Sequence, residues 1–172
     1  NNSVKVVPIP PARGLIFDRN KRILAENKIT HNLEIDPSKK IDIEKIANEL
    51  NPFVPITKND LAQYQRIIKN NYFSSTVPIK TDLTKQELAR FLTNKYLFNN
   101  ISLKTRLKRH YQHNGLTSHV VGYINRINQK DIKLLTKTKR LSLYRGSDHI
   151  GKRGIEQRYE NFINGYQGFE KI

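Results

Sequence analysis

The sequence predicts an α+β fold of short antiparallel strands and hairpins with several short helices. Some stretches alternate apolar and polar residues, which is typical of half-buried strands, and others repeat apolar residues at helical spacing behind capping residues. Strands and helices do not alternate regularly, so a parallel sheet of βαβ units is not indicated. The 172 residues suffice for one ordinary domain, or for a domain with a small appendage.

The N-terminal part predicts strands. Residues 4–9 form a short strand, and the prolines that follow keep the next segment extended. Residues 15–25 read as a β-hairpin whose turn, residues 18–21, contains Asp18 and Asn20. Residues 31–35 alternate as a third strand that ends before Pro37.

Helices dominate the middle of the chain. Asp42 caps a helix that ends before Asn51, and Thr57 caps a second helix, with Asp60 three residues later. Residues 75–81 predict an edge strand, because Pro78 cannot donate to a ladder. Thr84 and Glu87 then form a capping box that opens another helix.

The next part begins with the clearest alternation in the chain. Residues 101–107 predict a strand whose basic face carries Lys104, Arg106, Lys108 and Arg109, and we interpret this face as a solvated edge in preference to a nucleic-acid groove binder. A short apolar helix follows around residues 119–123, and another begins at Asn128.

The stretch 146–168 predicts the element that closes the fold. It reads as one helix with an apolar face, ended by Gly165, with Gly168 in the exit turn; the face comprises Ile155, Tyr159, Phe162 and Ile163. The same helix carries Glu156, an acidic residue expected to be buried. We hypothesise that Arg13, Asp18 and Arg19 form a buried or half-buried charge network with Glu156; the alternative is that these charges are solvated.

The net charge of +16 suggests a polyanionic partner. The alternative is a solvated basic surface beside an anionic membrane or cell wall, because the basic residues form no block. The absence of cysteine excludes disulfides and cysteine zinc sites. No stretch is apolar enough to span a bilayer. The absence of methionine leads us to expect a piece of a longer protein.

Catalytic motifs are missing from the sequence. It contains no Ser-x-x-Lys, Ser-x-Asn or Lys-Thr-Gly motif, no nucleophile elbow and no phosphate-binding glycine loop. His110 and His113 lack a nearby carboxylate in a ligand pattern, so we expect no metal and no cofactor. Asp148 and His149 lack a nucleophile, and His119 is interpreted as a hydrogen-bonded structural residue.

Three segments resemble the non-catalytic, N-terminal periplasmic module of class B penicillin-binding proteins. They are Pro11–Asn20, then Arg109–Tyr111 with His119–Tyr123, then Gly151–Glu156 followed by Tyr159, Gly165 and Gly168. The wording of residues 146–152 favours the elongation-specific branch over the division-specific one. Three departures occur: Lys21 and Asn114 replace usual glycines, and Gln112 replaces a usual proline.

The resemblance implies a pedestal for a C-terminal peptidoglycan D,D-transpeptidase domain that is absent from this sequence. It implies no catalysis by this segment, anchoring to the periplasmic side of the bacterial inner membrane, and partners of the RodA glycosyltransferase and MreC scaffold types. Residues 1–40 and 101–172 would form a membrane-proximal β-rich core closed by the 147–164 helix region, and residues 41–100 a helical head subdomain.

Matching positions are expected to have structural or interdomain roles. They are Arg13, Gly14, Asp18, Arg19, Arg109, Tyr111, His119, Gly122, Tyr123, Gly151, Gly154, Glu156, Tyr159, Gly165 and Gly168. The pedestal of a division-specific relative and a basic nucleic-acid-binding domain remain the alternative functions.

Overall fold

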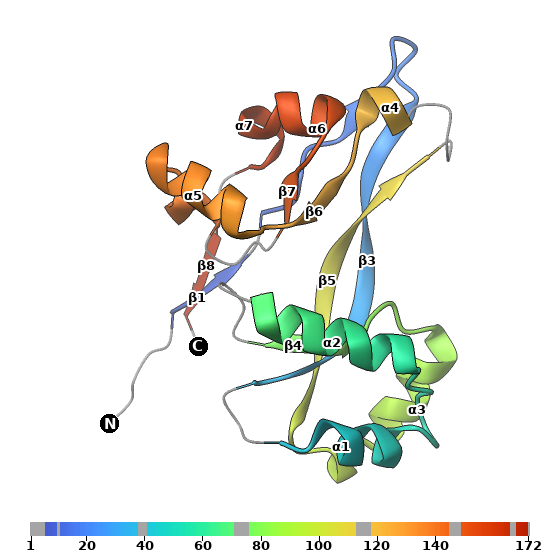
Figure 1. The fold of residues 1–172 in the computed structure, drawn as a ribbon. Helices are drawn as coiled ribbons and strands as arrows, with labels where there is room; N and C mark the ends of the chain where they lie inside the picture. Colours follow the sequence, from blue (N-terminus) through green and yellow to red (C-terminus); the bar gives the residue numbers. More distant parts are fainter. Residues whose placement is uncertain are drawn as a thin grey trace. The chain divides into compact units, whose positions relative to one another are not determined.

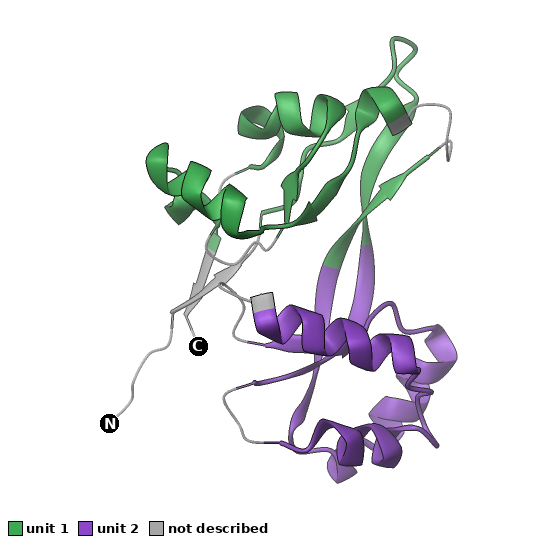
Figure 2. Cartoon of the chain, viewed as in Figure 1, with its two compact units in different colours: residues 1–28, 107–172 green, residues 29–106 purple. Residues whose placement is uncertain are grey.

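The structure, a computed structural model, describes most of the chain. The described residues are 6–9, 11–37, 41–70, 76–112, 118–144, 149–165 and 168–171. They divide into two compact units, unit 1 with residues 1–28 and 107–172, and unit 2 with residues 29–106 (Figure 2). The expected mixture of helices and antiparallel strands is confirmed in both units.

The boundaries between the units fall inside two long strands, β3 (Ile23–Ile35) and β5 (Ile101–Tyr111). The sequence placed the division at the ends of the helical segment, near residues 40 and 100. The structure instead assigns residues 29–40 and 101–106 to unit 2. The reason is that Leu33, Ile35 and Ile101 belong to the apolar core beneath the helices of that unit.

Unit 1 combines short strands with short helices (Figure 1). In chain order its further elements are β1 (Val6–Ile9), β2 (Ile16–Phe17), α4 (Ser118–Val121), β6 (Ile124–Arg126), α5 (Gln129–Lys137), a 3₁₀ turn (Leu141–Tyr144), β7 (His149–Gly151), α6 (Gly154–Arg158), α7 (Glu160–Ile163) and β8 (Gly168–Lys171).

Unit 2 has helices packed on antiparallel strands. Its further elements are α1 (Ile43–Leu50), α2 (Lys58–Asn70), β4 (Val77–Lys80), α3 (Lys85–Thr93) and a 3₁₀ turn (Lys95–Leu97). The predicted caps are present. Asp42 accepts from the backbone of α1, Thr57 and Asp60 bond each other's backbone N–H at the start of α2, and Thr84 forms a capping box with Glu87.

Strand β3 is the central strand of a four-stranded sheet and pairs with β2, β4 and β5. The predicted hairpin is present as β2 and β3, in antiparallel register with Ile16 opposite Ala25. The sequence predicted a separate strand at residues 31–35, but one continuous strand runs from Ile23 to Ile35. Backbone pairing continues the strand through the polar residues at its middle, because ladder hydrogen bonds are made by main-chain groups.

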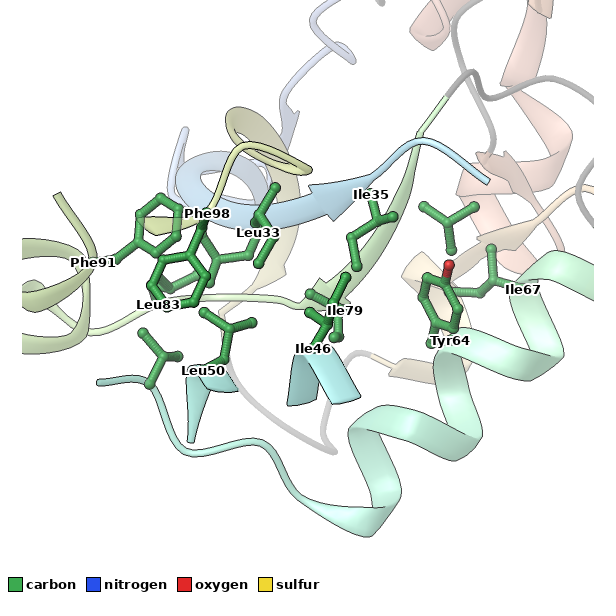
Figure 3. Close-up of a cluster of buried hydrophobic side chains, with 13 residues drawn as sticks. Leu33, Ile35, Ile46, Leu50, Tyr64, Ile67, Ile79, Leu83, Phe91 and Phe98 are labelled. Carbon is green, nitrogen blue, oxygen red and sulfur yellow. The ribbon is translucent and has the colours of Figure 1, made fainter. Parts of the chain in front are cut away.

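The core of unit 2 is a cluster of thirteen buried side chains from β3, β4, β5, the three helices and the connecting segments (Figure 3). They are Leu33, Ile35, Ile46, Leu50, Val54, Tyr64, Ile67, Val77, Ile79, Leu83, Phe91, Phe98 and Ile101. The predicted apolar stripes supply most of them. The apolar residues Ile68 of α2 and Leu92 of α3 are 43% and 49% exposed, because the buried arc of each helix is narrower than its apolar arc.

In unit 1, β1 pairs with β8 and β6 with β7, both antiparallel. Gly168 was expected in a turn, but it lies at the start of β8, opposite Ile9. One apolar cluster of the unit consists of Ile16, Ala25 and Val121, with partly buried neighbours that include Ile155 and Ile163.

The predicted C-terminal helix is interrupted. It divides into α6 and α7 at Tyr159, where φ is −104° and ψ is 19°. The prediction of one apolar face is therefore wrong in part: Ile155 and Ile163 pack inward, whereas Tyr159 and Phe162 are 51% and 84% exposed. Tyr159 itself leaves helical geometry at the break and Phe162 lies on the solvent side of α7, so only two of the four predicted residues line the apolar face.

Within the described part of the chain, no helix is long and apolar enough to cross a bilayer. The described residues also contain no group of histidines and carboxylates arranged to hold a metal ion.

Candidate functional site

A buried glutamate organises the polar interior of unit 1. Glu156, on α6, has no exposed surface. Its Oε2 accepts a hydrogen bond from Arg13 Nε at 2.6 Å, and its Oε1 accepts from Arg109 Nε at 2.8 Å. The Tyr111 hydroxyl donates to the same Oε1 at 3.3 Å. One carboxylate thus joins the N-terminal segment, strand β5 and helix α6.

A second carboxylate extends this arrangement. Glu160, on α7, is 7% exposed and accepts from Arg13 Nη2 at 2.6 Å and from the Tyr144 hydroxyl at 2.8 Å. Its Oε2 also accepts from the backbone N–H of Gly151 at 2.9 Å. We call this set the glutamate clasp; its members are Glu156, Glu160, Arg13, Arg109, Tyr111 and Tyr144.

Local backbone structure places the two carboxylates side by side. Glu156 and Glu160 are four residues apart and project to the same side, although the helix breaks at Tyr159 between them. A Cβ on Gly151 would lie 2.2 Å from the Glu156 carbonyl oxygen, so only glycine allows β7 to approach α6 this closely. The Gly151 N–H reaches Glu160 because of this approach.

The partners come from the other end of the sequence and from β5. Arg13 is fixed by Asn27, whose amide donates to the Arg13 carbonyl, and by the neighbouring Gly14 N–H, which donates to the Ile163 carbonyl at 2.8 Å. Arg109 and Tyr111 are two residues apart on β5 and therefore share one face of the strand. Arg109 Nη1 also donates to the side-chain oxygen Oδ1 of Asn27 at 3.2 Å.

The electrostatics of the clasp keep its donors protonated. Burial, followed by the negative charge of Glu156, raises the pKa of Tyr111 to about 12. Burial and the hydrogen bond to Glu160 likewise raise the pKa of Tyr144. Burial alone would lower the pKa of Arg13, but the hydrogen bonds and charges of Glu160 and Glu156 outweigh it and raise the pKa. Both tyrosines are therefore hydrogen-bond donors at neutral pH.

Such a site is suited to holding segments together. Two carboxylates face two guanidinium groups, so the buried charges balance. The oxygens of both clasp carboxylates are engaged by arginine, tyrosine and backbone donors, so Glu156 and Glu160 are occupied in holding these segments together. Arg109 Nη2 is the one buried side-chain polar atom in the described residues without a hydrogen-bond partner.

The structure brings together part of the predicted network. Of its members, Arg13 and Glu156 meet in the clasp, where Arg109 and Tyr111, which the predicted network did not include, join them. Asp18 does not join them: it accepts from the backbone N–H groups of Asn20 and Arg22 in its own turn. Arg19 is exposed, and neither Asp18 nor Arg19 contacts Glu156 in the described structure.

The predicted solvated basic face of β5 is wrong for two of its four residues, Arg106 and Arg109, which pair with buried carboxylates. Arg109 is only 9% exposed and pairs with Glu156. Arg106 makes a two-pronged contact with the buried Glu34, at 2.8 and 2.7 Å. Lys104 and Lys108 are exposed, as expected. The distant carboxylate partners of the arginines gave no local signal in the sequence.

Other positions that match the family motif shape the backbone next to the clasp. Gly122 has φ of +76°, and a Cβ there would lie 1.9 Å from the Arg153 carbonyl oxygen, so α4 meets the start of α6 through glycine. Gly154 faces it with φ of +63°. The Tyr123 carbonyl accepts from the Lys152 N–H at 2.9 Å. Gly165 ends α7 with φ of +65°, as predicted.

His119 is exposed on α4, contrary to the expectation of a hydrogen-bonded structural residue. The replacement Gln112 donates its backbone N–H to the Leu24 carbonyl at 3.0 Å, a bond that the proline usual in the family cannot make. His113, Asn114 and Asp148 lie outside the described residues.

Three residues around the clasp, Glu160, Tyr144 and Asn27, were not predicted from the sequence. Glu160 could have been found, because it follows Glu156 by one helical turn. Tyr144 and Asn27 gave no such signal, since each reaches the clasp through the folding of distant segments.

Comparison with known proteins bears on the whole chain. Residues 8–172 match the family described as Penicillin-binding Protein dimerisation domain. The chain is 34% identical over 171 residues to the peptidoglycan D,D-transpeptidase MrdA of Escherichia coli strain K12, covering 99% of this chain and 27% of that protein. MrdA of Haemophilus influenzae is 33% identical, with 99% and 26% covered.

Solved structures share the fold. A complex between penicillin-binding protein PBP2 and MreC from Helicobacter pylori superposes with a TM-score of 0.77 at 22% identity, covering 99% of this chain and 31% of that chain. Penicillin-binding protein 2B of Streptococcus pneumoniae gives 0.65 at 20% identity, with 99% and 37% covered.

The chain spans about a quarter of the length of these curated relatives. The match nevertheless covers nearly all of this sequence, including the clasp residues Arg13, Arg109 and Glu156. The chain therefore belongs to the penicillin-binding protein dimerisation domain family.

Proposed function

We propose that this chain is the non-catalytic pedestal of a peptidoglycan D,D-transpeptidase that works in cell-wall elongation and rod shape. The main support is the match of the whole chain to transpeptidases named MrdA, at 33–34% identity. That level of identity over 171 residues favours the elongation enzyme over the division-specific alternative. The catalytic serine and its motifs would belong to a separate domain of the parent protein.

The geometry suits a pedestal because it ties distant parts of the chain together. Strand β1 pairs with β8, so Val6 lies opposite Lys171. The glutamate clasp joins Arg13 to Glu156 across 143 residues of sequence. A module closed in this way transmits the position of one attached segment to another, and the clasp fixes that position because buried charge pairs are directional.

Partners and location follow from the same proposal. The related structure from Helicobacter pylori contains MreC, which supports an MreC-type scaffold as a partner of this module. A RodA-type glycosyltransferase remains a prediction from the family resemblance. The parent protein would be anchored in the bacterial inner membrane, with this module on the periplasmic side.

The proposal can be tested with a chimera. The corresponding segment of E. coli MrdA is replaced by this chain, and cell shape is scored after depletion of the native enzyme. We expect rod shape to be restored by the chimera and lost when it carries Glu156→Ala, with labelled penicillin still bound by the separate catalytic domain. A chimera with Glu49→Ala, at an exposed glutamate, serves as the control.

Two results would contradict the proposal. One is normal rod shape in cells whose MrdA lacks the segment altogether. The other is stable penicillin labelling of the isolated 172-residue chain, which would make this segment catalytic.

A further inference from the structure

We propose that the exposed face of α5 binds the surface of an anionic lipid membrane. This basic helix face consists of Lys130, Lys133, Leu134 and Lys137. These residues have the spacing i, i+3, i+4 and i+7, which aligns them in one stripe along the helix. All four are exposed, whereas Leu135 on the other side is buried.

Among the described residues, the lysines of this face form no ion pair. Asp131 is the single acidic residue between residues 127 and 144. It is already occupied, because it forms the capping box with Asn128 and an ion pair with Lys152. The surrounding unit is also basic: unit 1 has 19 lysines and arginines against 7 acidic residues, and unit 2 has 12 against 8. The field at the face therefore attracts anions.

The end of α5 adds a further positive charge. Lys139 follows the helix with φ of +55°, a left-handed conformation that favours glycine. The Arg140 N–H donates to the Leu135 carbonyl at 2.8 Å and the Lys139 N–H to the Thr136 carbonyl at 3.1 Å, which is the usual glycine-ended helix stop. Lys139 thus occupies a position whose left-handed backbone favours glycine, and its exposed side chain adds a positive charge at the end of α5.

The chemistry of the face favours lipid over nucleic acid. Leu134 is 60% exposed among the lysines, and Leu143 beyond the helix is 38% exposed. Exposed aliphatic side chains suit the boundary between headgroups and acyl chains, while lysine stems lie along it with their ammonium groups in the headgroup layer. Nucleic-acid surfaces combine arginine with stacking aromatic rings. The face has neither, and the nearby Tyr144 is fully buried.

Vesicle flotation tests the proposal, using the 172-residue chain and phosphatidylcholine vesicles with about one third phosphatidylglycerol. The test variant carries Lys130→Gln, Lys133→Gln and Lys137→Gln. Each lysine near an anionic surface strengthens binding about fivefold, so affinity should fall on the order of 100-fold. The control carries Lys45→Gln, Lys58→Gln and Lys85→Gln, three exposed lysines of unit 2, and should retain most binding.

A second variant separates the apolar contribution. Leu134→Ser should weaken binding less than the triple substitution, but this loss should persist at high salt, which screens charges and leaves apolar insertion intact. Far-UV circular dichroism and thermal melting verify that each variant is folded.

Three outcomes would overturn the proposal. In the first, the triple variant and its control bind anionic vesicles equally well. In the second, the unaltered chain binds uncharged phosphatidylcholine vesicles as well as anionic ones, and in the third it binds no vesicles but binds duplex DNA through the same lysines. None of these readouts depends on transpeptidase activity or on the pedestal role.

Discussion

The interiors of the two units differ in composition: that of unit 2 is mainly apolar, and that of unit 1 contains buried ion pairs. Unit 2 has thirteen buried apolar side chains in one cluster. Unit 1 places two carboxylates and two arginines in its interior, beside a cluster in which Ile16, Ala25 and Val121 are the buried members. Unit 2 also has a buried glutamate, Glu34, but its partner Arg106 lies partly in solvent.

The difference predicts different responses to mutation. Apolar burial has no preferred direction, so a core tolerates side chains of similar volume. Buried ion pairs are directional, and removal of one member strands the charge of the other. The interior of unit 2 should therefore be tolerant, whereas that of unit 1 should depend on a few atoms of the clasp.

Glu156→Ala should give the largest effect. It leaves Arg109 without its carboxylate and removes one of the two carboxylates of Arg13, so the free energy of unfolding should fall by about 3–5 kcal/mol. Guanidinium chloride unfolding followed by circular dichroism measures the change. Glu49→Ala, at an exposed glutamate of unit 2, should change it by less than about 0.5 kcal/mol. Equal, small effects of the two substitutions would show that the clasp charges are effectively solvated.

Leu50→Ala should cause the next largest loss of stability. Leu50 is fully buried in the unit 2 core, and truncation costs about 2–5 kcal/mol, depending on how far the cavity collapses. The matched substitution Leu50→Met conserves volume and should cost less than about 1.5 kcal/mol. The same measurement applies. If Leu50→Met were as damaging as Leu50→Ala, the contrast between a tolerant and a directional interior would fail.

Alkaline pH should weaken the clasp selectively. The pKa of Tyr111 is about 12 in the folded chain, against an ordinary value of 10. Because the folded-state pKa is raised, the stability it contributes is complete below pH 10 and is lost as pH rises from 10 through about 12. Unfolding midpoints measured across this range should decline less steeply for Tyr111→Phe.

Tyr96→Phe is the control for this pH dependence. Tyr96 is 74% exposed in unit 2, and its replacement should leave the alkaline decline as steep as in the unaltered chain. If the unfolding midpoint of Tyr111→Phe declined with pH as steeply as that of Tyr96→Phe, Tyr111 would not contribute to the stability of the clasp.

Lys21→Gly should have the smallest effect, and it should be stabilising. Lys21 has φ of +61° in the turn between β2 and β3, a conformation that costs a residue with a Cβ about 1 kcal/mol. Glycine removes this strain, and thermal melting should show a gain of about 0.5–1 kcal/mol. Lys28→Gly, within strand β3, should instead destabilise the chain by about 0.5–1 kcal/mol. A loss of stability in both variants would refute this explanation.

The sequence by itself determined the local elements. Asp42, Thr84 and Asn128 cap helices as predicted, because a cap depends on residues three positions apart. Asp18 forms the predicted hairpin turn for the same reason. The burial of Glu156 was also expected from the sequence, where it is an acidic residue on a short helix otherwise dense in lysine and arginine.

Only the tertiary structure decided which charges meet. Arg13 and Arg19 lie in the same short segment, yet Arg13 reaches Glu156 and Arg19 is exposed. Arg13 is held in place by Asn27, whose amide donates to the Arg13 carbonyl, and by the backbone hydrogen bond from Gly14 to Ile163, and neither contact is visible in residue spacing. Caps and turns are set by neighbours in sequence, whereas an ion pair across 143 residues is set by the folding of all the elements between them.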